Sequence, residues 1–123
     1  PLPDRLKEIH KSVLGFIERY LPDVVALEDV FFGKNVRSLV KMGEARASAL
    51  LAATERNVPV VEYPPARVKQ AISGNGRASK IQGQQMVKHL LRLPSAPPVD
   101  AADALAVALC HLHTQKNVRI PIG

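Results

Sequence analysis

Tryptophan is absent from the sequence and cysteine occurs only once. Because one cysteine, Cys110, cannot form an intramolecular disulfide, the class of small secreted proteins that depend on disulfides is excluded. Apolar runs fall well short of the roughly 18 residues that a transmembrane helix requires. Residues 1–10 are too polar for a signal peptide. The sequence thus gives no support for secretion or a membrane partner, and it predicts a cytoplasmic protein.

Acidic residues are also in the minority. The 123 residues include eleven Asp and Glu against seventeen Lys and Arg, which gives a net charge of +6. A basic surface favours a polyanionic partner such as nucleic acid, although many basic domains of this size bind no anion. With 46% apolar residues the chain is long enough to bury a core, and its length predicts one domain over residues 1–123.

Helical and strand patterns alternate along the chain. Three-and-four spacing of apolar residues, interrupted by turn residues, predicts helices over residues 6–20, 34–57, 66–72, 79–91 and 100–113. Two continuous apolar runs, at 24–27 and 58–63, predict strands that are buried on both faces. We expect residues 73–80 to be a mobile loop and residues 116–123 to be a flexible tail.

This alternation is typical of an α/β fold, but the chain contains too few strands for one. A two-stranded sheet with open edges is not a stable core for five helices. We therefore expect further strands N-terminal to Pro1, so that the domain is N-terminally incomplete.

Three carboxylates occupy positions where functional groups gather. Glu28 ends the first predicted strand, and ligand sites of open α/β sheets lie at the carboxyl ends of strands. Asp100 and Asp103 lie three residues apart at the start of a helix and share one face. Solvent exposure of a strand end would explain Glu28 alone, and helix capping would explain the two aspartates. Neither alternative explains why all three could meet, whereas a two-metal phosphodiesterase, with Mg²⁺ ions roughly 4 Å apart, needs carboxylates from different elements.

Four sequence blocks, in one order, extend this pattern: "ALEDVFFGKN", "KMGEARA", "VPVVEYPPARVKQAISGNGRASK" followed by "QMV", and "DAADALAVAL". With these blocks the chain resembles the RuvC-type Holliday-junction resolvases, which are crossover junction endodeoxyribonucleases of the ribonuclease-H-like superfamily. The resemblance implies a central mixed sheet flanked by helices. In that family the first of four acidic ligands lies on the opening strand in a Gly-Ile-Asp-Pro-Gly-like motif. No such motif occurs here, so the resemblance implies that the first three strands and one catalytic aspartate are missing.

The resemblance also implies roles for individual residues. It makes Glu28, Asp100 and Asp103 ligands of two Mg²⁺ ions, with Mn²⁺ as an alternative, and it makes Lys80 catalytic. Relatives can carry histidine at the position of Asp100. The residues that the resemblance implies contact DNA are Phe31, by stacking on an unstacked base, and Lys69 and Lys80, by charge near the scissile phosphate. Further basic residues are candidates for phosphate contacts: Lys34, Arg37, Arg67, Arg77 and Lys88. Burial in the core is the alternative for Phe31 and Phe32, and a solvated surface is the alternative for the lysines.

Two histidines near the end of the chain do not suggest a metal site. His111 and His113 are two residues apart. Because side chains at this spacing diverge on a helix, a zinc site is rejected.

The function implied by the resemblance is resolution of four-way junctions in recombination and DNA repair, by paired symmetric nicks that leave a 5′ phosphate and a 3′ hydroxyl. Implied partners are junction DNA, a second copy of the chain and a branch-migration motor complex. We expect the dimer contact on the helix at 34–57, through Gly43 and Ala47. A related ribonuclease-H-like transposase and a noncatalytic DNA-binding or dimerisation fragment are the alternatives, and the missing aspartate implies that the chain alone is inactive.

Overall fold

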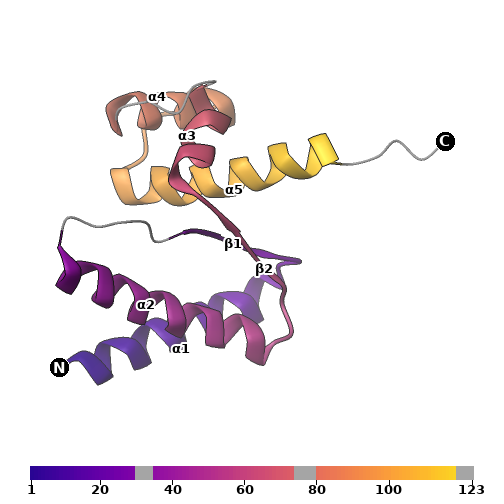
Figure 1. Ribbon diagram of the computed structural model, residues 1–123. Coiled ribbons are helices and arrows are strands. Elements are labelled where there is room, and N and C mark those ends of the chain that lie inside the picture. The colour runs from indigo at the N-terminus through magenta and orange to yellow at the C-terminus, as the bar shows by residue number, and fades with distance from the viewer. Residues whose placement is uncertain (30–34, 74–79, 119–123) are drawn as a thin grey trace. The chain divides into compact units, whose positions relative to one another are not determined.

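The computed structural model describes residues 1–29, 35–73 and 80–118, and the chain forms two strands and five helices within these ranges (Figure 1). Their order is α1 (Leu2–Tyr20), β1 (Val25–Glu28), α2 (Val36–Glu55), β2 (Val60–Tyr63), α3 (Pro65–Ser73), α4 (Lys80–Leu91) and α5 (Val99–Val118). Each predicted element is present, so the α/β pattern is confirmed. No helix in the described ranges is both long and apolar enough to cross a membrane.

The first helix is longer than its apolar spacing indicated. It begins at Leu2, and Pro3 is tolerated because the first turn of a helix has N–H groups without intrahelical partners. It ends where Leu21 adopts the left-handed conformation, with φ of 48°, and donates its N–H to the Ile17 carbonyl at 2.9 Å. Pro22 follows directly and prevents continuation of the helix.

The last helix corrects one expectation about Asp100. The helix starts at Val99, and the Ala102 N–H donates to the carbonyl of Pro98 at 2.8 Å. Asp100 therefore does not cap the helix, because the first intrahelical bond is accepted two residues before it. Its carboxylate lies in the first turn, where the positive end of the helix dipole still stabilises a negative charge.

The same helix also runs further than predicted. It continues through Val118, so the prediction of a tail is wrong for residues 116–118, while residues 119–123 lie outside the described part of the chain. No glycine or proline stands between His113 and Val118, and without such a stop signal the backbone hydrogen bonds continue.

The two strands form a parallel sheet. The Val25 N–H donates to the Pro59 carbonyl at 2.9 Å, and the Asp29 N–H donates to the Tyr63 carbonyl at 2.8 Å, so both bonds join the strands at the same register. Burial on both faces was expected and is wrong for the described residues. The three apolar residues of β1 are half-buried, and its last residue, Glu28, is exposed.

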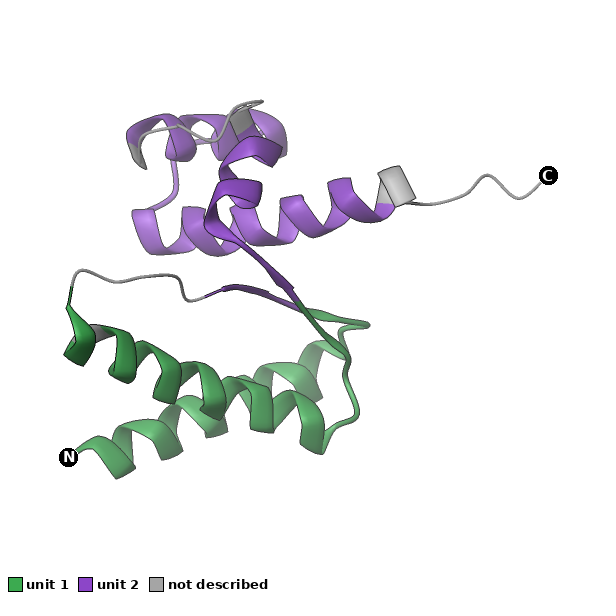
Figure 2. Ribbon diagram, viewed as in Figure 1, with its two compact units in different colours: residues 1–25, 30–61 green, residues 26–29, 62–123 purple. Residues whose placement is uncertain are grey.

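The chain divides into two compact units (Figure 2). In unit 1, residues 1–25 and 30–61, helices α1 and α2 lie side by side. Its buried core consists of Ile17 from α1 with Ala52 and Ala53 from α2, and the two alanines allow a close approach of the helices. A hydrogen bond and an ion pair add to this contact. His10 Nε2 lies 2.9 Å from Glu55 Oε1, and Arg56, directly after α2, donates through Nη2 to Glu18 Oε2 at 2.7 Å.

Helix α2 also carries an exposed stripe of apolar and small residues. Val36 is 75% exposed, Val40 51% and Leu51 59%, and Gly43 and Ala47 are exposed between them. A Cβ built at Gly43 would have no atom within 4 Å. The apolar spacing predicted this stripe correctly, but its own unit leaves it uncovered. We call these five residues the α2 stripe.

Unit 2 comprises residues 26–29 and 62–123. Helices α3 and α4 each pack on α5. The core consists of side chains from these three helices: Val68, Ile72, Val87, Ala106, Val107 and Cys110. Ala26 of β1 and Tyr63 of β2 pack against this cluster. The carboxyl ends of both strands are therefore fixed to the three-helix core that carries Asp100 and Asp103.

Candidate active site

Glu28 is the last residue of β1, as the sequence predicted. Successive side chains of a strand alternate between its faces, so Glu28 lies on the same face as Ala26. Since Ala26 packs against the core of α3, α4 and α5, that face is the one toward these helices. The Asp29 N–H is bonded to the Tyr63 carbonyl directly after Glu28, and this bond fixes the backbone at the tip of the strand.

Charges from two helices act on Glu28. Partial burial raises the pKa of its carboxyl group, and the negative charge of Asp103 raises the pKa further. The positive charge of Lys69 lowers the pKa and so opposes both effects. Because such effects act over short distances in a protein, Asp103 of α5 and Lys69 of α3 both lie near the end of β1. The sequence predicted that a strand end and the start of the last helix would meet. In the structure, Glu28 and Asp103 lie close enough for their charges to interact.

Asp100 is placed differently from the other two acids. It lies one helical turn before Asp103 on the same face of α5, and both side chains are exposed. Within the described residues no group of three or more His, Cys, Asp or Glu side chains lies close enough to hold a metal ion. The structure therefore brings together a pair of carboxylates, Glu28 and Asp103, and does not bring Asp100 into one cluster with them.

The chemistry of the pair fits a divalent cation. Carboxylate oxygens are the hard ligands that Mg²⁺ and Mn²⁺ prefer. Two carboxylates whose charges raise a pKa repel each other, and a cation between them would remove that repulsion. Lys69 is a cation itself and is no metal ligand, but it is suited to a phosphate group at the same place.

The remaining predicted residues fall into two groups. Arg37 is exposed in the first turn of α2, and its N–H donates to Asn35 Oδ1 at 2.9 Å. Arg67 of α3 donates through Nη2 to Thr114 Oγ1 at 3.0 Å. Lys80 opens α4, but its side chain lies outside the described part of the structure. The predicted residues that lie entirely outside the described ranges are Phe31, Phe32, Lys34 and Arg77.

One polar contact near the strand ends had no signal in the sequence. The hydroxyl of Tyr63, the last residue of β2, lies 2.6 Å from His111 Nδ1 of α5. The two residues are 48 positions apart, and neither belongs to a motif that could have paired them. His111 was considered only as a metal ligand, whereas the structure gives it a tyrosine partner.

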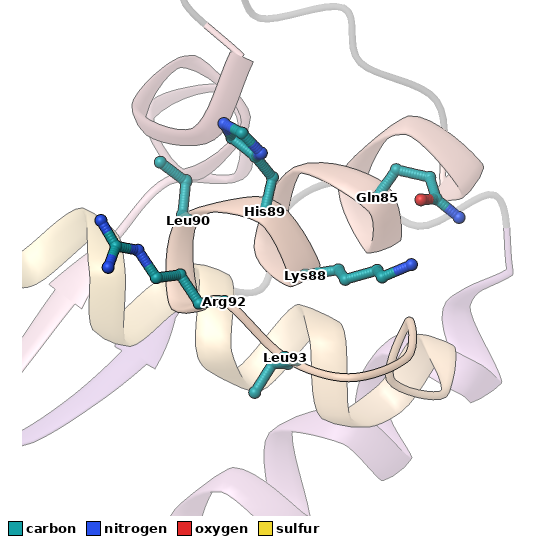
Figure 3. Close-up of a pocket in the computed structure, with 6 residues that line it drawn as sticks. All are labelled: Gln85, Lys88, His89, Leu90, Arg92 and Leu93. Atoms are coloured by element: carbon teal, nitrogen blue, oxygen red, sulfur yellow. The ribbon is translucent and has the colours of Figure 1, made fainter.

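A basic hollow of about 620 Å³ lies at the C-terminal end of α4 (Figure 3). Lys88 and Gln85 extend to one side of it and Arg92 extends to the other. Arg92 and Leu93 donate their N–H groups to the carbonyls of His89 and Lys88, at 3.3 and 2.9 Å, so the helix end is already capped. Among the residues that the structure describes, the lining of the hollow has no acidic side chain and consists of Gln85, Lys88, His89, Leu90, Arg92 and Leu93.

A pair of parallel strands, with a carboxylate at the end of β1 near an aspartate in the first turns of the last helix, is typical of an α/β domain of the ribonuclease-H-like class. Two solved structures have the same fold. The chain superimposes on a Thermus thermophilus RuvC structure with a TM-score of 0.86 and 41% identity, over 95% of this chain and 71% of that one. A T. thermophilus RuvC in complex with Holliday junction substrate gives a TM-score of 0.89 and 40% identity, over 99% and 75%.

Sequence comparisons give the family. Residues 1–111 match the family described as crossover junction endodeoxyribonuclease RuvC. The RuvC proteins of Shewanella baltica (strain OS155) and Vibrio campbellii are each 50% identical over 117 residues, which is 95% of this chain and 68% of each relative. The chain belongs to the RuvC family of crossover junction endodeoxyribonucleases. The resemblance and the fold class stated from the sequence are thereby confirmed.

Proposed function

We propose that this chain, once completed by N-terminal strands, forms a structure-selective endodeoxyribonuclease that resolves Holliday junctions in recombination and DNA repair. The observation that carries the proposal is the pairing of Glu28 and Asp103 beside Lys69 at the end of a parallel strand. The names of the relatives support it, and so does the neighbouring T. thermophilus structure, which contains a Holliday junction substrate.

In the proposed mechanism the chain's own residues hold and orient the reacting groups. RuvC-type nucleases are metal-dependent, and the residues that would hold the metal here are Glu28 and Asp103, with Asp100, which the family resemblance implies, as a third. Two Mg²⁺ ions are the specific proposal, with Mn²⁺ as a substitute, and the chemistry that such ions supply is Lewis-acid activation of the phosphodiester and of the attacking water. Lys69 and Lys80 would offset the negative charge that develops on the phosphate.

Contacts to the DNA backbone are proposed for the basic residues outside the carboxylate pair. In the basic hollow, Lys88 and Arg92 extend to opposite sides, which suits an extended polyanion better than one small anion (Figure 3). Phosphate contacts of this kind fix position without reading sequence. Phe31 is proposed to stack on an unpaired base, and for this residue the support is the family resemblance alone.

Two carboxylates are fewer than a two-metal site needs. The family resemblance places another acidic ligand on a strand N-terminal to Pro1, so we propose that the site is complete only when that strand is present. We define the extended form as this chain joined at Pro1 to N-terminal strands that carry this aspartate.

The direct test of function compares two substrates and two proteins. In Mg²⁺ the extended form should cut a synthetic four-way junction with paired symmetric nicks and leave a linear duplex of the same sequence intact. The chain that begins at Pro1 should bind the junction without cutting it, measured by gel shift and by strand cleavage. Equal cutting of junction and duplex would contradict structure selectivity. Binding by the extended form without any cutting would favour the noncatalytic alternative.

Dimer formation is proposed to use the α2 stripe, because a symmetric junction needs two active sites related by a two-fold axis. The exposed apolar side chains around Gly43 and Ala47 are consistent with a helix face that a second copy covers. The branch-migration complex expected from the resemblance is part of the same proposal, with no surface assigned to it.

Gly43→Leu should weaken the dimer at least about tenfold, since an added side chain would separate two closely packed helices. A side chain at this position meets no atom of the same chain, so the folded protomer should tolerate it. Sedimentation velocity over a range of concentrations measures the dissociation constant, and Ala47→Leu provides a second variant. Gly15→Leu is the control, because Gly15 also lies in a helix with open space around it. An unchanged dimer in both α2 variants would exclude this face.

A further inference from the structure

A chain of hydrogen bonds connects the tip of β1 to helix α5. The Asp29 N–H, directly after Glu28, donates to the backbone carbonyl of Tyr63 at 2.8 Å. The side chain of the same tyrosine continues the connection, with its hydroxyl 2.6 Å from Nδ1 of His111. The two rings lie 5.8 Å apart and are tilted by 53°, so the contact includes packing as well as the bond. Tyr63 therefore binds the β1 tip with its backbone and α5 with its side chain.

Two weaker contacts support the same connection. Arg67, in the first turns of α3, donates to Thr114 Oγ1 at 3.0 Å, and its own carbonyl lies 3.7 Å from Cys110 Sγ. Cys110 and His111 are neighbours on α5, and Thr114 lies one turn further along the helix. The corner where β2 leads into α3 is thus held to one segment of α5 by three side-chain contacts.

This segment is part of the helix that carries the active-site aspartate. His111 lies eight residues after Asp103, which corresponds to about 12 Å along a helix with a rise of about 1.5 Å per residue. A helix of this length moves as a rigid element. A contact that fixes α5 at His111 therefore also fixes the rotation of the helix about its axis and its position along that axis, and with them the position of Asp103. Glu28 and Asp103 therefore sit on two elements that Tyr63 and His111 hold together.

We propose that Tyr63 and His111 are positioning residues, whose hydrogen bond sets the separation of Glu28 and Asp103 for cation binding. The inference rests on the proposed function, since it assigns a purpose to that separation. Two carboxylates repel each other, so a contact that holds their elements together is needed most before a cation binds. Loss of this hydrogen bond should lower the cleavage rate, because small displacements of groups at a reacting centre lower reaction rates strongly.

The first test variant, Tyr63→Phe, removes the hydrogen bond and keeps both rings. In the extended form, Tyr63→Phe should lower single-turnover junction cleavage about tenfold at limiting Mg²⁺, with junction affinity unchanged within about twofold. Raising the Mg²⁺ concentration should restore most of the rate. His111→Leu should act like Tyr63→Phe, and the double variant should be no worse than either. His111→Gln, whose amide can both donate and accept a hydrogen bond, should retain most of the rate.

A matched control separates positioning from stability. His10→Leu removes a side-chain bond of 2.9 Å between α1 and α2, in the unit without the carboxylate pair. Each of the two variants loses one hydrogen bond, so both should lower the melting temperature. His10→Leu should nevertheless leave the rate of junction cleavage unchanged. Equal cleavage by Tyr63→Phe and wild type at limiting Mg²⁺, or an equal loss in His10→Leu, would overturn the inference.

A second readout does not depend on cleavage. In the chain that begins at Pro1, Mn²⁺ should broaden the amide NMR signals of Glu28 and Asp103 together, and Tyr63→Phe should require several-fold more Mn²⁺ for the same effect. If the extended form cleaves no junction, the proposed function fails while this measurement still decides the positioning role. Identical Mn²⁺ titrations for the two proteins would reject that role.

Discussion

Glu28→Gln should reduce junction cleavage by the extended form at least about 10³-fold, while junction affinity stays within about twofold. An amide has nearly the shape of the carboxylate but carries no charge, so a divalent cation loses a hard anionic ligand. Binding should persist because the basic residues that contact phosphates are unchanged. Single-turnover cleavage at saturating protein, together with gel-shift titration, separates the two quantities.

The same substitution should make the folded protein more stable at neutral pH. Burial and the charge of Asp103 raise the pKa of Glu28 in the folded state above its value in the unfolded chain. The folded state therefore holds this proton more tightly, and stability falls as the pH rises through the range between the two pKa values. Above that range Glu28 is charged in both states, and its charge lowers the free energy of unfolding by the full amount. Glu28→Gln removes this charge and so removes the loss of stability.

The expected gain is below about 1 kcal/mol at pH 7, because Glu28 is exposed and solvent screens its charge. At about pH 3, below the ordinary pKa of a glutamate, the variant and the wild type should unfold alike. Urea unfolding of the chain at both pH values measures this. Glu8→Gln, on the exposed surface of α1, is the control and should change little at either pH.

Two outcomes would contradict the role of Glu28. Cleavage by Glu28→Gln within tenfold of the wild type would exclude it as a metal ligand. A loss of stability at pH 7 would show that the carboxylate stabilises the fold. Asp29→Asn provides the matched comparison for cleavage, since it changes the neighbouring carboxylate, and it should cost less than about tenfold.

Lys69→Gln should lower junction cleavage by about 10-fold to 100-fold and shift the acid limb of the pH–rate profile to higher pH. The positive charge of Lys69 lowers the pKa of Glu28, so its removal raises that pKa and the metal-binding carboxylate form appears only at higher pH. Loss of the lysine also removes a positive charge that offsets the developing charge on the phosphate. Single-turnover rates from pH 5 to 9 at fixed Mg²⁺ measure both effects.

Lys11→Gln makes the same change in net charge on α1, at an exposed residue of unit 1. It should leave the position of the acid limb unchanged. A rate loss in Lys69→Gln that is constant at all pH values would mean that the lysine acts on the substrate alone. An unchanged rate would remove Lys69 from the proposed site.

The helices and strands were predictable from spacing, but burial was not. On α2 the three-and-four pattern identified an apolar stripe, yet Val36 and Val40 are exposed while Ser48 is buried in the same helix. Periodicity shows which residues share a face and says nothing about what covers that face. The length of α5 was underestimated for a related reason, since polar residues continue a helix until a stop signal occurs.

The candidate site was predictable to the extent that it depends on element ends. Glu28 at the end of a strand and Asp103 near a helix start were placed correctly, because strand termini and first helical turns can be read from local signals. The distance from Asp100 to Glu28 depends on how α5 packs, which no local pattern encodes. The bond between Tyr63 and His111 is equally inaccessible, since it joins two residues that only the tertiary fold brings together.

The single thiol of the chain has a practical consequence for spectroscopy. Cys110 is 1% exposed, and burial raises the pKa of its thiol. The group is both shielded from reagents and protonated at neutral pH, so it reacts slowly with maleimides. A cysteine introduced at the rim of the basic hollow, for example Gln85→Cys, would take up a fluorescent dye selectively while Cys110 stays in place. Junction arrival and departure could then be followed in real time on an otherwise unaltered core.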